Sequence, residues 1–100
     1  MPKLNVVVPH QLTTEEAKGR IQGMVSEAMA KYATQVSDFS ENWTGDQGKF
    51  SGRAMGFSVS GTVDVRPGEV AINGNLPLAA TMFKGQIESM IRDRAGKLLS

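Results

Sequence analysis

The chain has 100 residues, the length of one domain, so we expect residues 1–100 to fold around a single core. Eleven lysines and arginines stand against ten acidic residues, and the net charge of +1 lacks the basic surplus that nucleic-acid binding normally requires. Cysteine is absent, which excludes disulfides, thiolate metal ligands and a cysteine nucleophile.

The sequence contains no candidate membrane span or secretion signal. The longest aliphatic run is Val6-Val7-Val8, far short of the about 18 apolar residues that a membrane-spanning helix needs. The segment Met1–Asn5 is not followed by the apolar stretch of a signal peptide. We therefore expect a cytoplasmic protein without a membrane span.

In chain order, the first expected element is a strand over residues 3–8. Leu4, Val6 and Val8 occupy alternate positions and therefore share one face of this strand. Pro9 has no backbone N–H to donate to a neighbouring strand, so we expect the strand to end there.

A helix is expected next, over residues 14–33. Thr13 is a favourable N-cap residue, and Glu16 three positions later completes the sequence signature of a capping box. The apolar residues follow the 3.6-residue helical period and predict one buried stripe, which consists of Ala17, Ile21, Met24, Val25, Ala28 and Tyr32.

The middle of the chain predicts four strands, at about residues 38–43, 49–53, 57–66 and 69–75. The segment 57–66 is the clearest, because Phe and Val alternate with Ser, Thr and Asp, as in an antiparallel sheet with one solvated face. Turns are expected at residues 45–48, at 54–56 and at 66–69, where Pro67-Gly68 suits a type II turn.

A second helix is predicted to start between Pro77 and Ala80 and to run close to Leu99. Its apolar side consists of Phe83, Ile87, Met90, Ile91 and Leu98. Its solvent side offers pairs of opposite charge four residues apart, which are Lys84–Glu88, Glu88–Arg92 and Asp93–Lys97.

Arg94 lies near the centre of this apolar stripe and has two interpretations. Its long side chain can reach past the end of the sheet into water. Alternatively, it can form a buried pair with an acidic strand residue such as Glu41.

Together these elements predict an α+β fold in the order β-α-β-β-β-β-α. The strands should form one antiparallel sheet, and the two helices should cover its apolar face. The predicted core consists of Leu4, Val6, Ile21, Val25, Trp43, Phe57, Val59, Val63, Ile72, Phe83, Ile87 and Ile91.

Catalytic chemistry has few candidate residues in this chain. His10 is the only histidine, and its imidazole could serve as a polar or acid–base site, but a hydrogen bond within its loop is the more ordinary role. Asp38 and Glu41 should point to opposite faces of a strand, which argues against a metal site with Asp46. We therefore expect no catalytic residue, no metal and no cofactor.

The first helix carries a second stripe, of small residues, opposite its predicted buried face. It consists of Gly19, Gly23, Ser26 and Ala30. Glycine inside a helix costs about 1 kcal/mol relative to alanine, so two glycines in one line suggest close approach of another backbone. The alternatives are a weak homodimer or partner contact through this stripe, and a plain solvated face.

The aromatic residues also allow more than one interpretation. Phe39, Trp43, Phe50 and Phe57 could form a stacking platform for bases, but core packing is favoured without a basic groove around them. A hydrophobic ligand cavity between the sheet and the C-terminal helix is a further alternative.

Several short motifs, in their order and spacing, resemble a family of small bacterial proteins, the polyhydroxyalkanoic acid system proteins. The resemblance spans nearly the whole chain. The motifs are Val8-Pro9-His10-Gln11-Leu12, Thr14-Glu15-Glu16-Ala17, Trp43-Thr44-Gly45-Asp46, Phe50, Gly56-Phe57, Gly61-Thr62-Val63-Asp64-Val65, Leu76-Pro77, Phe83-Lys84-Gly85-Gln86-Ile87-Glu88 and Ile91.

The resemblance implies a cytoplasmic bacterial protein encoded near genes for storage-polyester granules, with no established activity. The expected function is therefore that of a non-catalytic accessory protein at the granule surface or bound to granule proteins. The alternatives are a carrier of acyl chains with a cavity between sheet and C-terminal helix, and a protein-interaction module without lipid contact.

Overall fold

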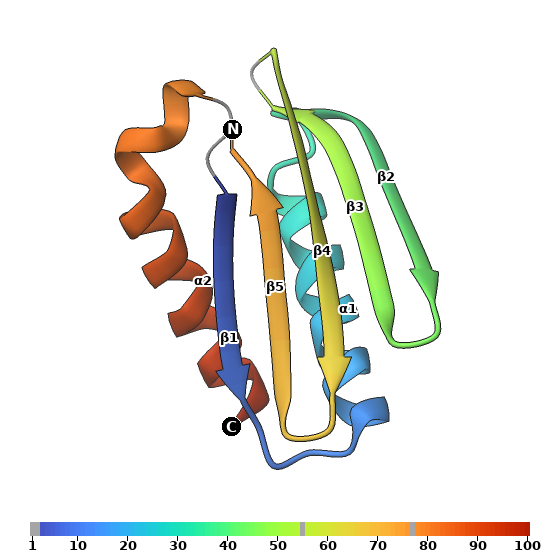
Figure 1. Ribbon diagram of the computed structural model, residues 1–100. Helices are drawn as coiled ribbons and strands as arrows, with labels where there is room; N and C mark the ends of the chain where they lie inside the picture. Colours follow the sequence, from blue (N-terminus) through green and yellow to red (C-terminus); the bar gives the residue numbers. More distant parts are fainter. Residues whose placement is uncertain (1–2, 55, 77) are drawn as a thin grey trace.

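A computed structural model describes residues 3–54, 56–76 and 78–100 of the chain. Five antiparallel strands form one sheet in the order β1-β5-β4-β3-β2, and both helices lie on the same face of it (Figure 1). The α+β class and the order β-α-β-β-β-β-α are those predicted from the sequence. The elements are β1 Lys3–Pro9, α1 Thr14–Lys31, β2 Val36–Thr44, β3 Gln47–Ala54, β4 Phe57–Arg66, β5 Glu69–Asn75, the 3₁₀ helix η1 Leu78–Phe83 and α2 Lys84–Leu99.

The predicted strands 57–66 and 69–75 have the bounds of β4 and β5, and the turn between them contains Gly68 with a positive φ of 86°. The predicted turn 54–56 includes Met55, which lies outside the described residues. In β2 the pairing shifts by one residue between Ser37 and Ser40, where Asp38 has a φ of 54°. This irregularity is a β-bulge, which a period-two pattern does not reveal.

The strand register explains the two faces of the sheet. Val6 of β1 pairs with Ile72 of β5, which pairs with Val63 of β4, so these three side chains face the helices together. The neighbouring positions Asn5, Asn73 and Thr62 pair in the same way on the opposite face. Period-two alternation therefore gives one apolar, helix-covered face and one polar, open face.

The core occupies the part of the sheet next to the hairpin between β4 and β5. The largest fully buried side chains are Val6, Val70, Ile21 of α1 and Leu99 of α2. Of the predicted core, only Phe57 and Phe83 are exposed, while the rest are buried or half-buried. Both lie away from this region, Phe57 at the start of β4 and Phe83 at the junction of η1 and α2.

Helix α1 confirms the predicted N-cap but not the full predicted stripe. The Thr13 hydroxyl accepts a hydrogen bond from the Glu16 backbone N–H at 3.1 Å. The helix ends at Lys31 rather than residue 33, and Ala28 and Tyr32 of the predicted stripe are exposed. The buried positions, Ala17 and Ile21, lie in the N-terminal half, because only that half packs on the core.

The C-terminal helical region starts with a 3₁₀ segment, and the α-helix begins only at Lys84. Pro77, where the sequence placed the earliest start, lies outside the described residues. Ala95 and Leu99 are the buried residues of α2, and Ile87, Ile91 and Leu98 pack partly buried beside them.

Arg94 is exposed, in agreement with the interpretation that its side chain reaches water, and the buried pair with Glu41 is not formed. Its place at the centre of the apolar stripe was wrong, because its neighbour Ala95 occupies the buried position on α2. The carboxylate of Glu41 instead accepts a hydrogen bond from Trp43 Nε1 at 2.7 Å.

The expected ion pairs within α2 do not form in the described part of the chain, where the ion pairs are Arg66–Asp64 and Arg66–Glu69. Glu88 accepts a hydrogen bond from the backbone N–H of Asn5 on the edge strand β1, at 3.1 Å. At the other end of α2, the Arg20 guanidinium donates to the carbonyl oxygens of Leu98 and Ser100, at 2.9 and 3.3 Å. These contacts fix α2 against both β1 and α1.

Gly61 and Gly74 pair directly across the centre of the sheet. A Cβ atom on Gly61 would lie 2.7 Å from the backbone carbonyl oxygen of Asn73, closer than real Cβ contacts. Glycine is therefore required at position 61 by the close approach of the neighbouring strand.

We predict that Gly61→Ala lowers the free energy of unfolding by about 1–3 kcal/mol, because the strands must separate to admit the methyl group. The matched control is Gly96→Ala in α2, where an added Cβ meets nothing within 4 Å. That variant should gain about 0.5–1 kcal/mol from helix propensity. Urea unfolding measures both, and a Gly61→Ala variant as stable as the wild type would contradict the steric argument.

Candidate functional site

His10 is 7% exposed and holds the β1–α1 connection against the β4–β5 hairpin. Its Nδ1 accepts a hydrogen bond from the Leu12 backbone N–H at 3.1 Å, and its Nε2 lies 2.9 Å from the Arg66 carbonyl oxygen. Because a carbonyl oxygen can only accept, the ring carries its proton on Nε2. The backbone N–H of His10 donates to Gly68 O at 2.9 Å.

Both ring nitrogens of His10 are thus used by the backbone, which supports the loop role expected from the sequence rather than an acid–base role. No group of three or more His, Asp or Glu side chains in residues 3–54, 56–76 and 78–100 could hold a metal ion. Within the same residues, no helix is both long enough and apolar enough to span a membrane.

The small-residue stripe of α1 faces away from the core. Gly19, Gly23, Ser26 and Ala30 lie outside the buried part of the helix, and a Cβ added at either glycine would meet nothing within 4 Å. The stripe is therefore accessible to a partner, and its role as a contact stays a prediction.

A second accessible surface is apolar and lies on η1 and the first half of α2. We call it the η1–α2 apolar surface, and it consists of Leu78, Met82, Phe83 and Met90. Leu78 is 79% exposed and Met82 is 88% exposed. Phe83 ends η1 as the N-cap residue of α2, and Met90 follows seven residues later, about two turns along α2. Ile87 and Ile91, which the sequence grouped with them, are half-buried against the core instead.

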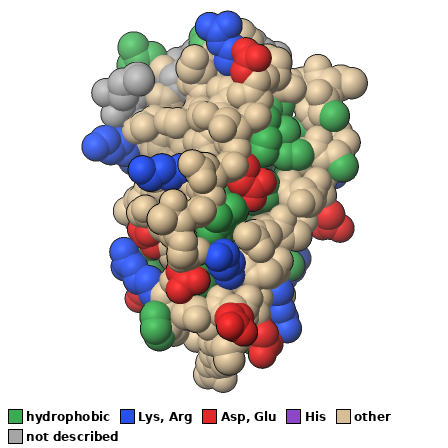
Figure 2. Space-filling model, turned by 90° about the vertical axis from the view of Figure 1, so that its right-hand side faces the viewer, with side chains coloured by type: hydrophobic (Ala, Val, Ile, Leu, Met, Phe, Trp, Pro, Cys, Tyr) green, Lys and Arg blue, Asp and Glu red, His purple; other side chains and the backbone are tan. Residues whose placement is uncertain are grey.

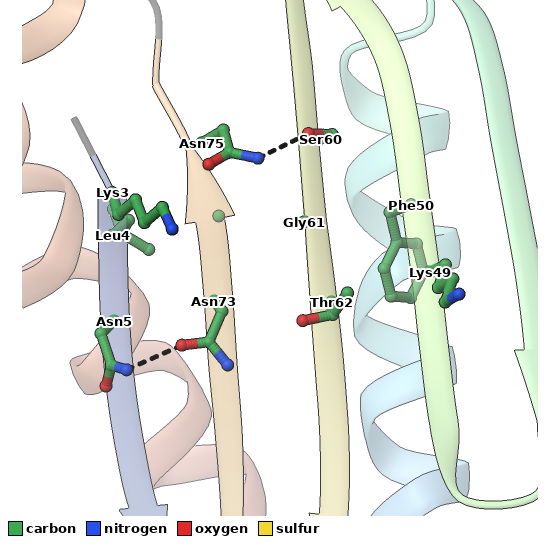
Figure 3. A pocket seen from close by; sticks show the side chains of 11 residues that line it. Lys3, Leu4, Asn5, Lys49, Phe50, Ser60, Gly61, Thr62, Asn73 and Asn75 are labelled. Atoms are coloured by element: carbon green, nitrogen blue, oxygen red, sulfur yellow. Dashed lines mark hydrogen bonds between the residues drawn. The ribbon is translucent and has the colours of Figure 1, made fainter. Parts of the chain in front are cut away.

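The open face of the sheet carries a shallow hollow of about 480 Å³, which we call the sheet-face trough. Its polar lining comes from β1, β5, β4 and β3 (Figure 3) and consists of Lys3, Asn5, Lys49, Ser60, Thr62, Asn73 and Asn75. Asn5 Nδ2 donates to Asn73 Oδ1 at 2.7 Å, and Asn75 Nδ2 donates to Ser60 Oγ at 3.1 Å. The sequence analysis did not identify this site. The polar residues at alternate positions of the strands do, however, identify the face of the sheet on which it lies.

Of the predicted aromatic cluster, Phe39, Trp43 and Phe50 lie on the helix side of β2 and β3, whereas Phe57 lies at the start of β4. Phe50 stacks on Phe39 with ring centroids 6.5 Å apart and meets Trp43 edge-on at 5.8 Å. The Trp43 ring lies over Gly48, where a Cβ would be 2.8 Å from it. Lys18 of α1 lies over the same indole, 5.4 Å from its centroid. On the side of the molecule that carries the β2 edge, hydrophobic side chains reach the surface among acidic and basic ones (Figure 2).

The prediction of core packing for the four aromatic residues holds in part. Trp43 and Phe50 are half-buried, whereas Phe39 and Phe57 are exposed.

The fold and these surfaces define a small α+β protein whose sheet has one helix-covered face and one open polar face. The model of a protein family described as "Putative polyhydroxyalkanoic acid system protein" matches residues 4–99. The chain therefore belongs to this family, as its motifs indicated.

No curated protein matches the chain in sequence. Among solved structures, the crystal structure of the protein TTHA0849 from Thermus thermophilus is similar over 98% of this chain and 92% of that one. The identity is 12% and the TM-score 0.42, a level of similarity that says nothing about activity.

We predict that His10→Ala lowers the free energy of unfolding by about 1–3 kcal/mol, because the Leu12 N–H and the Arg66 carbonyl lose their partner in a largely buried place. Gln11→Ala is the control, since Gln11 is adjacent and exposed. Chemical denaturation followed by circular dichroism measures the difference, and equal stability of the two variants would contradict the structural role.

The stripe on α1 leads to a separate prediction. If it is a dimer contact, wild-type protein forms a weak dimer, and the double variant Gly19→Glu/Gly23→Glu is a monomer in sedimentation velocity. Gln11→Glu/Gln35→Glu adds the same charge at exposed positions elsewhere and should leave the dimer intact. A wild-type protein that is monomeric at high concentration would contradict the hypothesis that the α1 stripe is a dimer contact.

Proposed function

We propose that this protein is a non-catalytic accessory protein of the polyhydroxyalkanoate storage system and acts in the cytoplasm at the surface of the polyester granule. The family assignment supports the biological setting. The observation that carries the proposal is the η1–α2 apolar surface, because several large apolar side chains exposed to solvent within one short segment of the chain are typical of an interaction site.

The character of the η1–α2 apolar surface suits an apolar interface. Met82 and Met90 are flexible and polarizable, and such side chains adapt to irregular apolar surfaces. Lys84, Arg94 and Lys97 lie on the same helix, and a helix with apolar and basic residues can lie at an interface. These apolar side chains are not the ones that cover the sheet, so interface binding does not require the core to open.

The arrangement around His10 supports a non-catalytic role. Its ring is engaged at both nitrogens and 7% exposed, which leaves no unengaged imidazole nitrogen for substrate. A His10→Ala variant that folds normally but loses a measured turnover would overturn this part of the proposal.

The carrier and the interaction module are the alternatives. A carrier would require a cavity between the sheet and α2, where Ile87 and Ile91 pack against the core. An interaction module would use the η1–α2 apolar surface or the α1 stripe for a granule protein.

We predict that purified protein sediments with native polyester granules and that Met82→Ser/Met90→Ser reduces the bound fraction. Burying one such side chain contributes about 1.5–3 kcal/mol, so losing two should weaken binding by about a hundredfold or more. Val7→Ser is the matched control, because Val7 is 45% exposed on the opposite face of the sheet.

Each outcome of this assay decides between the functions. Wild-type protein that stays in the supernatant, or a double variant that sediments unchanged, contradicts the granule-surface role. Binding of free acyl chains without granule binding supports the carrier. Capture of a granule protein without either supports the interaction module.

A further inference from the structure

The sheet-face trough offers hydrogen-bond donors with no carboxylate among its described lining residues. The Asn73 side-chain amide accepts from Asn5 through Oδ1, and its Nδ2 makes no hydrogen bond to the described part of the chain. Thr62 pairs with Asn73 in the strand register. Its hydroxyl also makes no hydrogen bond to the described part of the chain. The Ser60 oxygen accepts from Asn75, so its O–H remains a donor.

Lys49 supplies positive charge at one end of the row that continues through Thr62 and Asn73 to Asn5. Lys3 on β1 supplies a second positive charge in the neighbouring row, where it pairs with Asn75. The nearest acidic side chain on this face of β4 is Asp64. Its carboxylate is engaged by Gln47 Nε2 at 2.9 Å and by Arg66 at 3.8 Å. The trough is therefore complementary to a ligand that accepts hydrogen bonds and carries negative charge.

The dimensions favour a short linear ligand. Strands lie about 4.8 Å apart, so the row from β1 to β3 is about 14 Å long. Two rows of side chains border the trough, and the paired backbone of Gly61 and Gly74 lies between these rows. A second hollow of about 360 Å³ shares Ser60 and Asn75 with the trough and extends the polar surface toward Arg53 and Asp38.

Other ligand classes fit these residues less well. The one aromatic residue among the described lining, Phe50, stacks with Phe39 and Trp43 on the helix side, so the trough has no ring there on which a sugar or a base could stack. A linear ester of hydroxy acids, by contrast, accepts hydrogen bonds at every carbonyl and ends in a single carboxylate.

We propose that the sheet-face trough binds the carboxylate end of a short linear oligoester of hydroxy acids. Lys49 and Thr62 bind the carboxylate, and Asn73 Nδ2 and Ser60 O–H donate to ester carbonyl oxygens. The choice of an ester rests on the proposed function, whereas the need for an anionic acceptor rests on the lining residues.

The test is titration of ¹⁵N-labelled protein with the linear trimer of 3-hydroxybutyrate, followed by NMR. The amide signals of Gly61, Thr62, Asn73 and Gly74 should shift. Lys49→Gln and Thr62→Val should each weaken binding by about tenfold, since each removes a hydrogen bond to a charged group. Lys31→Gln on α1, which removes the same charge at an exposed position far along the chain from the trough residues, is the control and should bind as the wild type does.

A trimer that shifts none of these signals, or that binds Lys49→Gln as well as wild type, overturns the inference. Equal binding of the trimer methyl ester overturns it too, because that probe has no carboxylate. Granule sedimentation of Lys49→Gln should equal that of wild type. Trimer binding without granule sedimentation would contradict the proposed function but support the trough as a binding site. Granule sedimentation without trimer binding would support the proposed function but contradict the binding site.

Discussion

Both helices cover the same face of the five-stranded sheet, and the organisation of this molecule follows from that arrangement. Ile21 of α1 and Leu99 of α2 are fully buried, as are Val6 and Val70 on the sheet face that the helices cover. Side chains alternate between the two faces of a strand, so the residues before and after each helix-facing apolar residue point to the open face. The open face must then be solvated, and its Asn and Ser side chains hydrogen-bond to one another across the strands.

The edges of the sheet are blocked in two different ways, which leaves the faces as the accessible surfaces. On β1, the carboxylate of Glu88 occupies the backbone N–H of Asn5, a group that would otherwise be open to another strand. On β2, the bulge at Asp38 interrupts the regular edge. Edges protected in this way resist edge-to-edge pairing between molecules. A partner is therefore more readily bound by the open sheet face or by the helices.

The strands and helices could be predicted from the sequence because local patterns determine them. The alternation in residues 57–66 and the Pro67-Gly68 turn specify β4 and β5, and Thr13 specifies the start of α1. The exposure of Phe57, Phe83 and Tyr32 could not be predicted, since it depends on where the helices lie over the sheet. The same information decides that Ala95 rather than Arg94 is buried. Prediction of the trough would have required the register of four strands relative to one another, and no local sequence pattern specifies that register.

The two proposed binding surfaces are linked through the chain itself. Asn75, which lines the trough, ends β5, and Leu78 of the η1–α2 apolar surface follows three residues later. Three residues span at most about 11 Å even when extended, so the trough and the apolar surface approach each other at this end of the sheet. An apolar surface that contacts a polyester phase therefore brings the Asn75 end of the trough close to that phase, although the trough opens on the other face of the sheet. There the trough would meet chain ends, which carry the carboxylate, rather than the uncharged interior of the polymer.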